Sequence, residues 1–412
     1  MDTLPFVMVG HVDHGKSTLI GRLLYDTGSL PVEKMEEIRL ASKDKEEVEF
    51  AYVMDHLQEE RSRNITIDTA QTFFSTPRRE YVLIDAPGHK EFLKNMITGA
   101  SQARAAVLIV DVALGMEEQT RRHSYLLHLL GLDELIVVIN KMDLVDFSRQ
   151  RFESVKADLR AFLARIKLSP LHVIPISARW GDNVSLPSSR IPWYRGVTFL
   201  QALDSFRQPR SSRDKPLRFP IQLNRNYQGR DVLMGRVESG RLQVGDDLLL
   251  MPVGDRVRVE EIKIWGKDGV REAGAGESIG VVVVPEAGAA RGKIAASPDN
   301  PPFVTRSFRA VVFWLDPEPL RSGEKLLWRC ATQEISAQVN RIRERIDSST
   351  LEVLERESGG LDHSEVGDLE ISTSSPAVVE SFYLTPELGR FVLARGHQVV
   401  AGGIVTHPEM AK

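Results

Sequence analysis

The chain has 412 residues, 42% of them hydrophobic and 27% charged, and this balance excludes a disordered or low-complexity protein. Its formal net charge of −4 argues against nucleic-acid binding, because proteins that grip a phosphate backbone usually carry a basic face. The single cysteine, Cys330, excludes an internal disulfide and fits a reducing compartment. No apolar run approaches the roughly 20 residues that a membrane helix needs, so we expect a cytoplasmic protein without a membrane segment.

The first half of the chain alternates short apolar runs with helix-like segments. Helical patterns cover residues 17–25 and 117–130, and the charged stretch 33–63 is expected to be a solvated helical insertion. Near-continuous apolar runs suit parallel strands that are covered on both faces. These runs are residues 6–9, 81–84, 106–110, 135–139 and 173–176. The alternation predicts an α/β domain with a doubly wound, mostly parallel sheet.

The second half is rich in short strands. A polar, proline-bounded stretch at 208–216 predicts a linker, and residues 297–302 form a second break. Strand patterns follow the first break at 219–223, 232–237, 247–251, 257–264 and 278–284. Their turn-punctuated spacing predicts a small β-barrel, and a second β-rich stretch runs from 308 to 405.

The sequence GHVDHGKS at residues 10–17 matches the phosphate-binding loop pattern G-x-x-x-x-G-K-[ST]. It lies between a predicted strand and a predicted helix, where backbone N–H groups and the helix dipole favour phosphate. Lys16 is expected to reach the β- and γ-phosphates, and the Ser17 hydroxyl to ligate Mg²⁺. The expected nucleotide contacts of this loop are Gly10, His11, Val12, Asp13, His14, Gly15, Lys16, Ser17 and Thr18.

Two later segments supply the expected hydrolytic residues. Asp85 ends the strand at 81–84 and is expected to hold Mg²⁺, while the Gly88 N–H would contact the γ-phosphate. Thr66, in the sequence NITID, would give Mg²⁺ a second hydroxyl until hydrolysis removes the γ-phosphate, so this segment is a predicted switch. His89 is expected to orient the attacking water, the alternative being a histidine that faces solvent. A metal cluster of His11, His14 and His89 is disfavoured, because neither cysteine nor helical histidine spacing supports it.

Base specificity is assigned to the sequence NKMD at residues 140–143. The Asp143 carboxylate can accept hydrogen bonds from guanine N1–H and the exocyclic amine, whereas adenine offers no such donors there. Asn140 would read the other side of the base, and the Lys141 stem would cover its ring. Ser177 and Ala178 end the last strand and can present backbone N–H to the guanine carbonyl. The expected ligands are therefore GTP or GDP with Mg²⁺, and the expected activity is GTP hydrolysis.

Together the sequences GHVDHGKST, ITID, DAPGH, KNMITGAS, NKMD and SA resemble the translation-factor class of GTPases. That resemblance implies a GTPase domain at residues 1–210 followed by β-barrel domains at 211–300 and 301–412. It also implies that His89 positions water, with Val12 and Ile65 as apolar gate residues beside it.

Within this class, the large subunit of bacterial sulfate adenylyltransferase is the preferred resemblance. STLIGRLLYDTG, QTRRHSYLLHLLGL, GRVESGRLQVGD and VVFWLDPEPLRSGEK carry it. It implies a GTPase that drives adenylylsulfate formation by a separate catalytic small subunit, in a heterodimer or larger assembly without nucleic acid. The alternative is the elongation factor that carries aminoacyl-tRNA, which AYVMDHLQEERSRNITID and GHKEFLKNMITGASQA resemble. His14 and Asn64 depart from the sulfate adenylyltransferase pattern, which has Asp and Gly at these positions.

Overall fold

The computed structural model describes residues 3–30, 50, 71–85, 103–207, 212–227, 230–288 and 291–408. The chain divides into two compact units, Met1–Arg207 and Gln208–Lys412. No helix within the described ranges is both long enough and apolar enough to cross a membrane. The insertion expected at 33–63 lies outside the described residues except for Phe50, and the three-domain division at 210 and 300 stays a prediction.

The first unit is built on a six-stranded sheet with the order β2-β3-β1-β4-β5-β6. The edge strand β2 runs antiparallel to β3, and the remaining neighbours pair in parallel. The strands are β1 (Thr3–Val9), β2 (Gln71–Ser75), β3 (Glu80–Asp85), β4 (Ala105–Asp111), β5 (Leu135–Asn140) and β6 (His172–Pro175). This architecture confirms the predicted doubly wound α/β fold.

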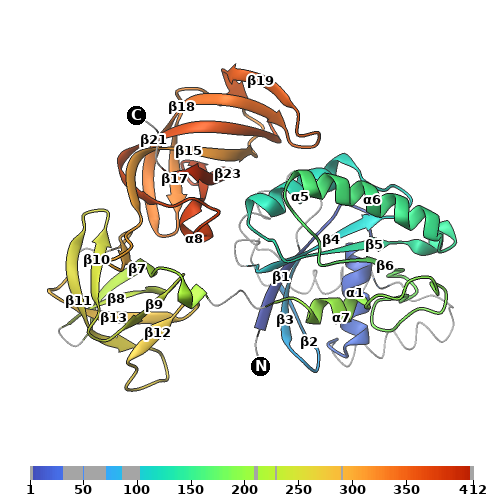
Figure 1. The fold of residues 1–412 in the computed structure, drawn as a ribbon, viewed down its shortest axis with the longest axis horizontal. Helices are drawn as coiled ribbons and strands as arrows, with labels where there is room; N and C mark the ends of the chain where they lie inside the picture. Colours follow the sequence, from blue (N-terminus) through green and yellow to red (C-terminus); the bar gives the residue numbers. More distant parts are fainter. Residues whose placement is uncertain are drawn as a thin grey trace. The chain divides into compact units, whose positions relative to one another are not determined.

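Helices cover both faces of this sheet (Figure 1). They are α1 (Lys16–Asp26), α5 (Glu118–Leu129), α6 (Arg149–Arg165) and α7 (Phe199–Asp204), with a 3-10 turn η2 (Met142–Val145) after β5. Phe6 and Met8 of β1 pack in one buried cluster with Leu19 of α1 and Phe199 of α7, whereas α5 and α6 lie on the opposite side. The central strands are consequently apolar on both faces, which explains their near-continuous hydrophobic runs.

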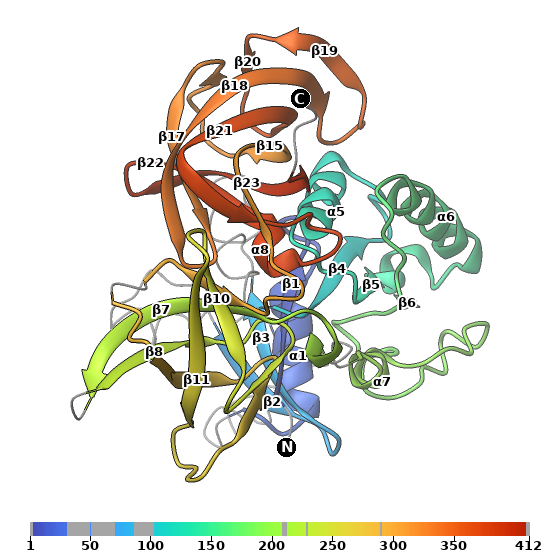
Figure 2. The same cartoon turned by 60° about the vertical axis from the view of Figure 1, so that its left-hand side comes forward.

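The second unit contains two barrels, as the resemblance implied. The first is closed by six strands in the order β10-β11-β13-β8-β7-β14. Figure 2 shows β7, β8, β10 and β11 of this barrel. Its strands are β7 (Arg218–Tyr227), β8 (Arg230–Arg236), β10 (Asp247–Met251), β11 (Asp255–Lys263), β13 (Ser278–Val284) and β14 (Ile294–Ala296). A two-stranded ladder of β9 (Arg241–Gln243) and β12 (Glu272–Gly274) flanks it, and the 3-10 turn η3 (Ser212–Asp214) precedes it.

The second barrel follows the order β17-β22-β23-β15-β21-β18-β19, and an additional β17–β18 pairing closes it. The strands are β15 (Phe303–Trp314), β17 (Lys325–Cys330), β18 (Gln333–Asp347), β19 (Val353–Ser358), β21 (Glu365–Val379), β22 (Arg390–Arg395) and β23 (Gln398–His407). The short strands β16 (Leu320–Arg321) and β20 (Gly360–Leu361) pair with each other, and α8 (Pro386–Gly389) precedes β22. Aromatic rings of Phe308, Trp328 and Phe391 fill the barrel.

A buried ion pair joins the two barrels. Arg218 of β7 is 1% exposed, and its Nη2 donates to Glu380 Oε1 at 2.5 Å while Nε donates to Oε2 at 3.1 Å. Its Nη1 also donates to the carbonyls of Leu217 and Asn300. Because a guanidinium taken from water must be both paired and hydrogen-bonded, this contact is stable only when the two barrels are together.

We expect Glu380→Gln to lower the free energy of unfolding of the full chain by about 3 kcal/mol, because it leaves the Arg218 charge buried without a counter-ion. The matched control is Glu334→Gln, which removes a carboxylate that is 57% exposed in its pair with Arg329. We expect that control to change stability by less than about 0.5 kcal/mol. Urea unfolding of both variants tests the difference, and equal midpoints would contradict a structural role for the buried pair.

Candidate functional site

The phosphate-binding loop lies between β1 and α1, as the sequence predicts. Gly15 has φ of +89° and is the residue before the first turn of α1. A Cβ on Gly15 would lie 2.4 Å from Asn140 Nδ2, and one on Gly10 would lie 2.3 Å from Ile109 Cγ2. Both positions therefore exclude a side chain, and the left-handed backbone at Gly15 adds a second reason for glycine there.

Side-chain hydrogen bonds fix the course of this loop. Lys16 Nζ donates to the Gly10 carbonyl at 2.8 Å, across the mouth of the loop. The His14 N–H donates to the His11 carbonyl at 3.3 Å, and the His14 carbonyl accepts from Asn140 Nδ2 at 2.9 Å. Asp13 also has a positive φ, of 67°, so the loop turns tightly on either side of His14. The backbone N–H groups at the start of α1 are thus held in a phosphate-binding conformation.

Lys16 and Asp85 form the electrostatic centre of the site. Burial lowers the pKa of Lys16, and the carboxylates of Asp85 and Asp13 oppose that effect. Burial raises the pKa of Asp85, and the Lys16 charge opposes it. Asp85 Oδ1 is buried and has no hydrogen-bond partner in the part of the chain that the structure describes. A buried carboxylate oxygen without a donor is a suitable position for a hard cation, so Asp85 fits its expected role at Mg²⁺.

The predicted base-binding residues meet at the carboxyl ends of β5 and β6. Asn140 Oδ1 accepts from the Ala178 N–H at 2.9 Å. The Ser177 hydroxyl donates to Asp143 Oδ1 at 2.5 Å, which fixes the carboxylate orientation. Lys141 has φ of 64°, and its Nζ lies 2.8 Å from Asp111 Oδ2. The phosphate loop and the segment after β6 are therefore joined through Asn140.

Several predicted residues lie outside the described part of the chain. Thr66, Gly88 and His89 belong to this group, as does Ile65 of the expected gate. Val12, the other gate residue, is 36% exposed on the phosphate loop. The hydrolytic roles assigned to these residues stay predictions.

Sequence reasoning missed three residues that the fold brings to the loop. Asp111 ends β4 and pairs with Lys141, and Glu117 contacts His14. His123 of α5 is 2% exposed, and burial, with repulsion from Lys16 second, lowers its pKa to about 3, so the ring is neutral above that pH. Asp111 could have been found because it ends the strand next to the phosphate-loop strand. No sequence motif near Glu117 or His123 indicates that either residue lies near the phosphate loop.

This fold and this site are those of a P-loop GTPase. Residues 1–209 match the family described as Elongation factor Tu GTP binding domain, and residues 307–406 match GTP-eEF1A C-terminal domain-like. The chain therefore belongs to the elongation factor Tu class of translation-factor-like GTPases, which bind GTP.

Relatives match over almost the whole chain. Elongation factor 1-alpha of Archaeoglobus fulgidus is 39% identical over 405 residues, which cover 96% of this chain and 96% of the relative. The bifunctional enzyme NodQ of Rhizobium meliloti is 35% identical over 415 residues, which cover 98% of this chain and 64% of that protein. A crystal structure of sup35 with GDP is 26% identical, with a TM-score of 0.47, and the match covers 100% of this chain and 95% of that one.

We expect Gly15→Ala to weaken GDP binding by at least about tenfold, because the new Cβ would push Asn140 away from the loop. The control is Gly28→Ala, which also has a positive φ, +65°, but meets no atom within 4 Å. Isothermal titration with GDP measures both variants. Equal losses would mean that backbone strain alone, and not the Asn140 contact, makes glycine necessary at position 15.

Proposed function

We propose that this chain is the GTP-hydrolysing regulatory subunit of a sulfate adenylyltransferase. In this role its GTP turnover is coupled to the reaction of ATP and sulfate to adenylylsulfate and pyrophosphate, which a separate small subunit catalyses. The chain's own reaction is the in-line attack of water on the γ-phosphorus of GTP. The water oxygen bonds to phosphorus as the bond to the β–γ bridging oxygen breaks, giving GDP and inorganic phosphate.

Each residue of the site has one task in this reaction. Lys16 neutralises charge on the β- and γ-phosphates from its position at the mouth of the loop. Asp143 and Asn140 hold the guanine, and the Ser177 hydroxyl keeps the Asp143 carboxylate in orientation. Ser17, Thr66 and Asp85 would hold Mg²⁺, which when bound supplies further charge neutralisation at the phosphate oxygens. His89 orients the attacking water.

One observation favours an enzyme subunit over RNA as the partner: the second barrel carries few free cations. Residues 301–412 contain twelve lysines and arginines against sixteen aspartates and glutamates, so this stretch alone has a net charge of −4. Carboxylates pair with most of its arginines. These arginines are Arg309, Arg329, Arg341, Arg343, Arg345, Arg356 and Arg395.

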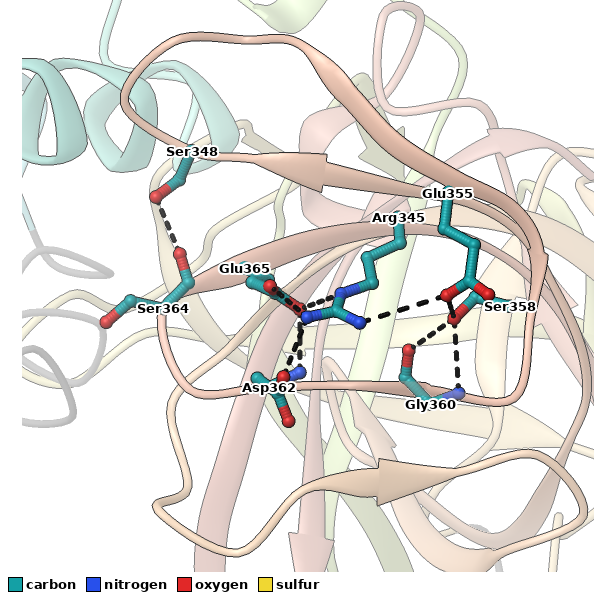
Figure 3. Close-up of polar contacts among 8 residues, drawn as sticks. All are labelled: Arg345, Ser348, Glu355, Ser358, Gly360, Asp362, Ser364 and Glu365. Carbon is teal, nitrogen blue, oxygen red and sulfur yellow. Dashed lines mark hydrogen bonds and ion pairs between the residues drawn. The ribbon is translucent and has the colours of Figure 1, made fainter.

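Arg345 illustrates how completely these charges are used (Figure 3). Its Nε and Nη2 donate to the two oxygens of Glu365 at 2.7 and 2.8 Å. The Asp362 carboxylate accepts from Nη2 at 2.7 Å, and Glu355 lies 3.8 Å from Nη1. Three carboxylates surround this guanidinium, and two of them accept hydrogen bonds from its Nε and Nη2, so its charge is largely neutralised and is less available to a phosphate. A surface of such pairs is better suited to a protein than to an RNA backbone.

The second candidate is a carrier of aminoacyl-tRNA. It is favoured by the relatives themselves, because the curated proteins that match over 96–97% of this chain at 38–40% identity are named elongation factor 1-alpha. The two candidates share the GTPase site and differ in what the barrels contact.

We expect His89→Ala to lower the rate constant of GTP hydrolysis roughly 100-fold and to leave GTP affinity nearly unchanged, because the imidazole acts on water and not on the nucleotide. Single-turnover hydrolysis and equilibrium binding of a non-hydrolysable GTP analogue measure the two quantities. Unchanged hydrolysis would remove His89 from the proposed mechanism.

The choice of partner is tested with the purified full chain. The proposal predicts that a small subunit co-purifies and that sulfate with ATP raises GTP turnover in that complex. The carrier function predicts instead a steeply salt-dependent affinity for aminoacyl-tRNA in the GTP state. Salt-dependent tRNA binding without stimulation by sulfate and ATP would overturn the proposal in favour of the second candidate.

A further inference from the structure

The side chain of His14 is enclosed by the phosphate loop and its neighbours. His14 is 0% exposed, although the adjacent Val12 and Asp13 are exposed. Its Nε2 lies 2.9 Å from Glu117 Oε2, and its Nδ1 lies 3.3 Å from the Ile109 carbonyl oxygen. Because a carboxylate only accepts hydrogen bonds, the proton at Nε2 is donated to Glu117. The buried ring thus donates one hydrogen bond, to Glu117, and its other nitrogen lies against the Ile109 carbonyl of β4.

These contacts attach the loop at a second point, independent of Asn140. The carboxamide of Asn140 holds the His14 backbone carbonyl, whereas Glu117 holds the ring. Ile109 belongs to β4, and Glu117 immediately precedes α5, at positions 95 and 103 residues from His14 in the sequence. The loop is therefore anchored to β5 through its backbone and to the start of α5 through a side chain.

The carboxylate of Glu118, next to Glu117 in the sequence, pairs along the helix and not with His14. Glu118 is the first residue of α5, but its side chain is 59% exposed, and among the residues that the structure describes it pairs along the helix, with Arg122. The Glu117 side chain is 32% exposed and spans 103 residues of sequence to reach a fully buried partner. Both residues carry the same charge at the same helix terminus, so the helix dipole acts on them almost equally. Only their contacts differ.

We infer that Glu117 is a positioning residue for nucleotide binding, which acts through His14 to hold the phosphate loop in its binding conformation. The inference rests on the loop binding guanine nucleotide. A loop held before the ligand arrives loses less conformational freedom on binding, so an anchor of this kind raises affinity without touching the nucleotide. GDP and GTP use the same loop, and both should lose affinity equally when the anchor is removed. Discrimination between bases should not change, because Asp143 is not involved.

The test compares Glu117→Gln with the matched control Glu118→Gln in the full chain. We expect Glu117→Gln to raise the dissociation constants for GDP and GTP about tenfold, because a neutral carboxamide oxygen accepts more weakly from His14 Nε2 than the carboxylate does. The KM for GTP should rise by the same factor at unchanged kcat, and the preference for GDP over inosine diphosphate should stay as in the unaltered chain. Glu118→Gln should match the unaltered chain in each measurement. Thermal unfolding of each variant shows whether folding is retained.

His14→Asn separates the proposed contact from a general effect of charge. In the His14→Asn background, Glu117→Gln should cause little further loss of affinity, because the contact is already absent. A full tenfold loss in that background, or equal effects of Glu117→Gln and Glu118→Gln, would overturn the inference. So would a loss of kcat or a changed base preference. If the unaltered chain does not bind GDP, both the inference and the GTPase assignment are wrong. If it binds GDP but the variants behave as just described, only the inference is wrong.

Discussion

The nucleotide site depends on one buried carboxamide, that of Asn140. Its Nδ2 donates to the His14 carbonyl of the phosphate loop, and its Oδ1 accepts from the Ala178 N–H of the guanine loop. The side chain is 2% exposed, so losing either partner would leave a buried polar group without a hydrogen bond. The phosphate loop and the segment after β6 that is predicted to bind the base are consequently held together by a single residue.

The close fit around that carboxamide explains why the loop sequence is so restricted. Gly15 lies against Asn140 Nδ2, and Gly10 lies against Ile109, so side chains at either position would separate the loop from the strands that support it. Lys16 follows Gly15 directly, and its ammonium is partly desolvated while it donates to the Gly10 carbonyl. A partly desolvated ammonium gains more from an arriving phosphate than a hydrated one would, because the cost of removing its water has already been met in folding.

Local sequence patterns were sufficient to predict the parallel strands and to place the phosphate-loop motif between β1 and α1. Strands buried on both faces must be apolar throughout, and glycine spacing in the loop reflects steric limits that act within a few residues. The edge strand β2 was not predicted, because it is covered on only one face and alternates buried Phe74 with exposed Phe73. The spacing of turns predicted the barrels. It did not predict the order of their strands, because many of the strands that pair are far apart in the sequence.

Within the site, too, contacts between residues far apart in the sequence could not be predicted from local patterns. Asp85 and Asn140 are the last residues of β3 and β5, and Asp143 lies just after β5. Strand ends that share one edge of a sheet must converge. Glu117 and His123 lie in or beside a helix whose pattern is that of any amphipathic helix. Glu117 pairs with His14, 103 residues away, and the pKa of His123 is lowered in part by the charge of Lys16, which is also distant in the sequence. No pattern within a short window reports such a contact.

The pair of Arg218 and Glu380 has a consequence for how proteins of this class can be recombined. Each barrel contributes one half of a charge pair that is stable only with its counterpart. In a chimera that takes one barrel from a relative, Arg218 or Glu380 would be buried without the partner that pairs with it in this chain. The two barrels are therefore a single exchangeable module, and a crossover placed in the linker before residue 212 keeps that module whole, whereas one placed between the barrels divides it.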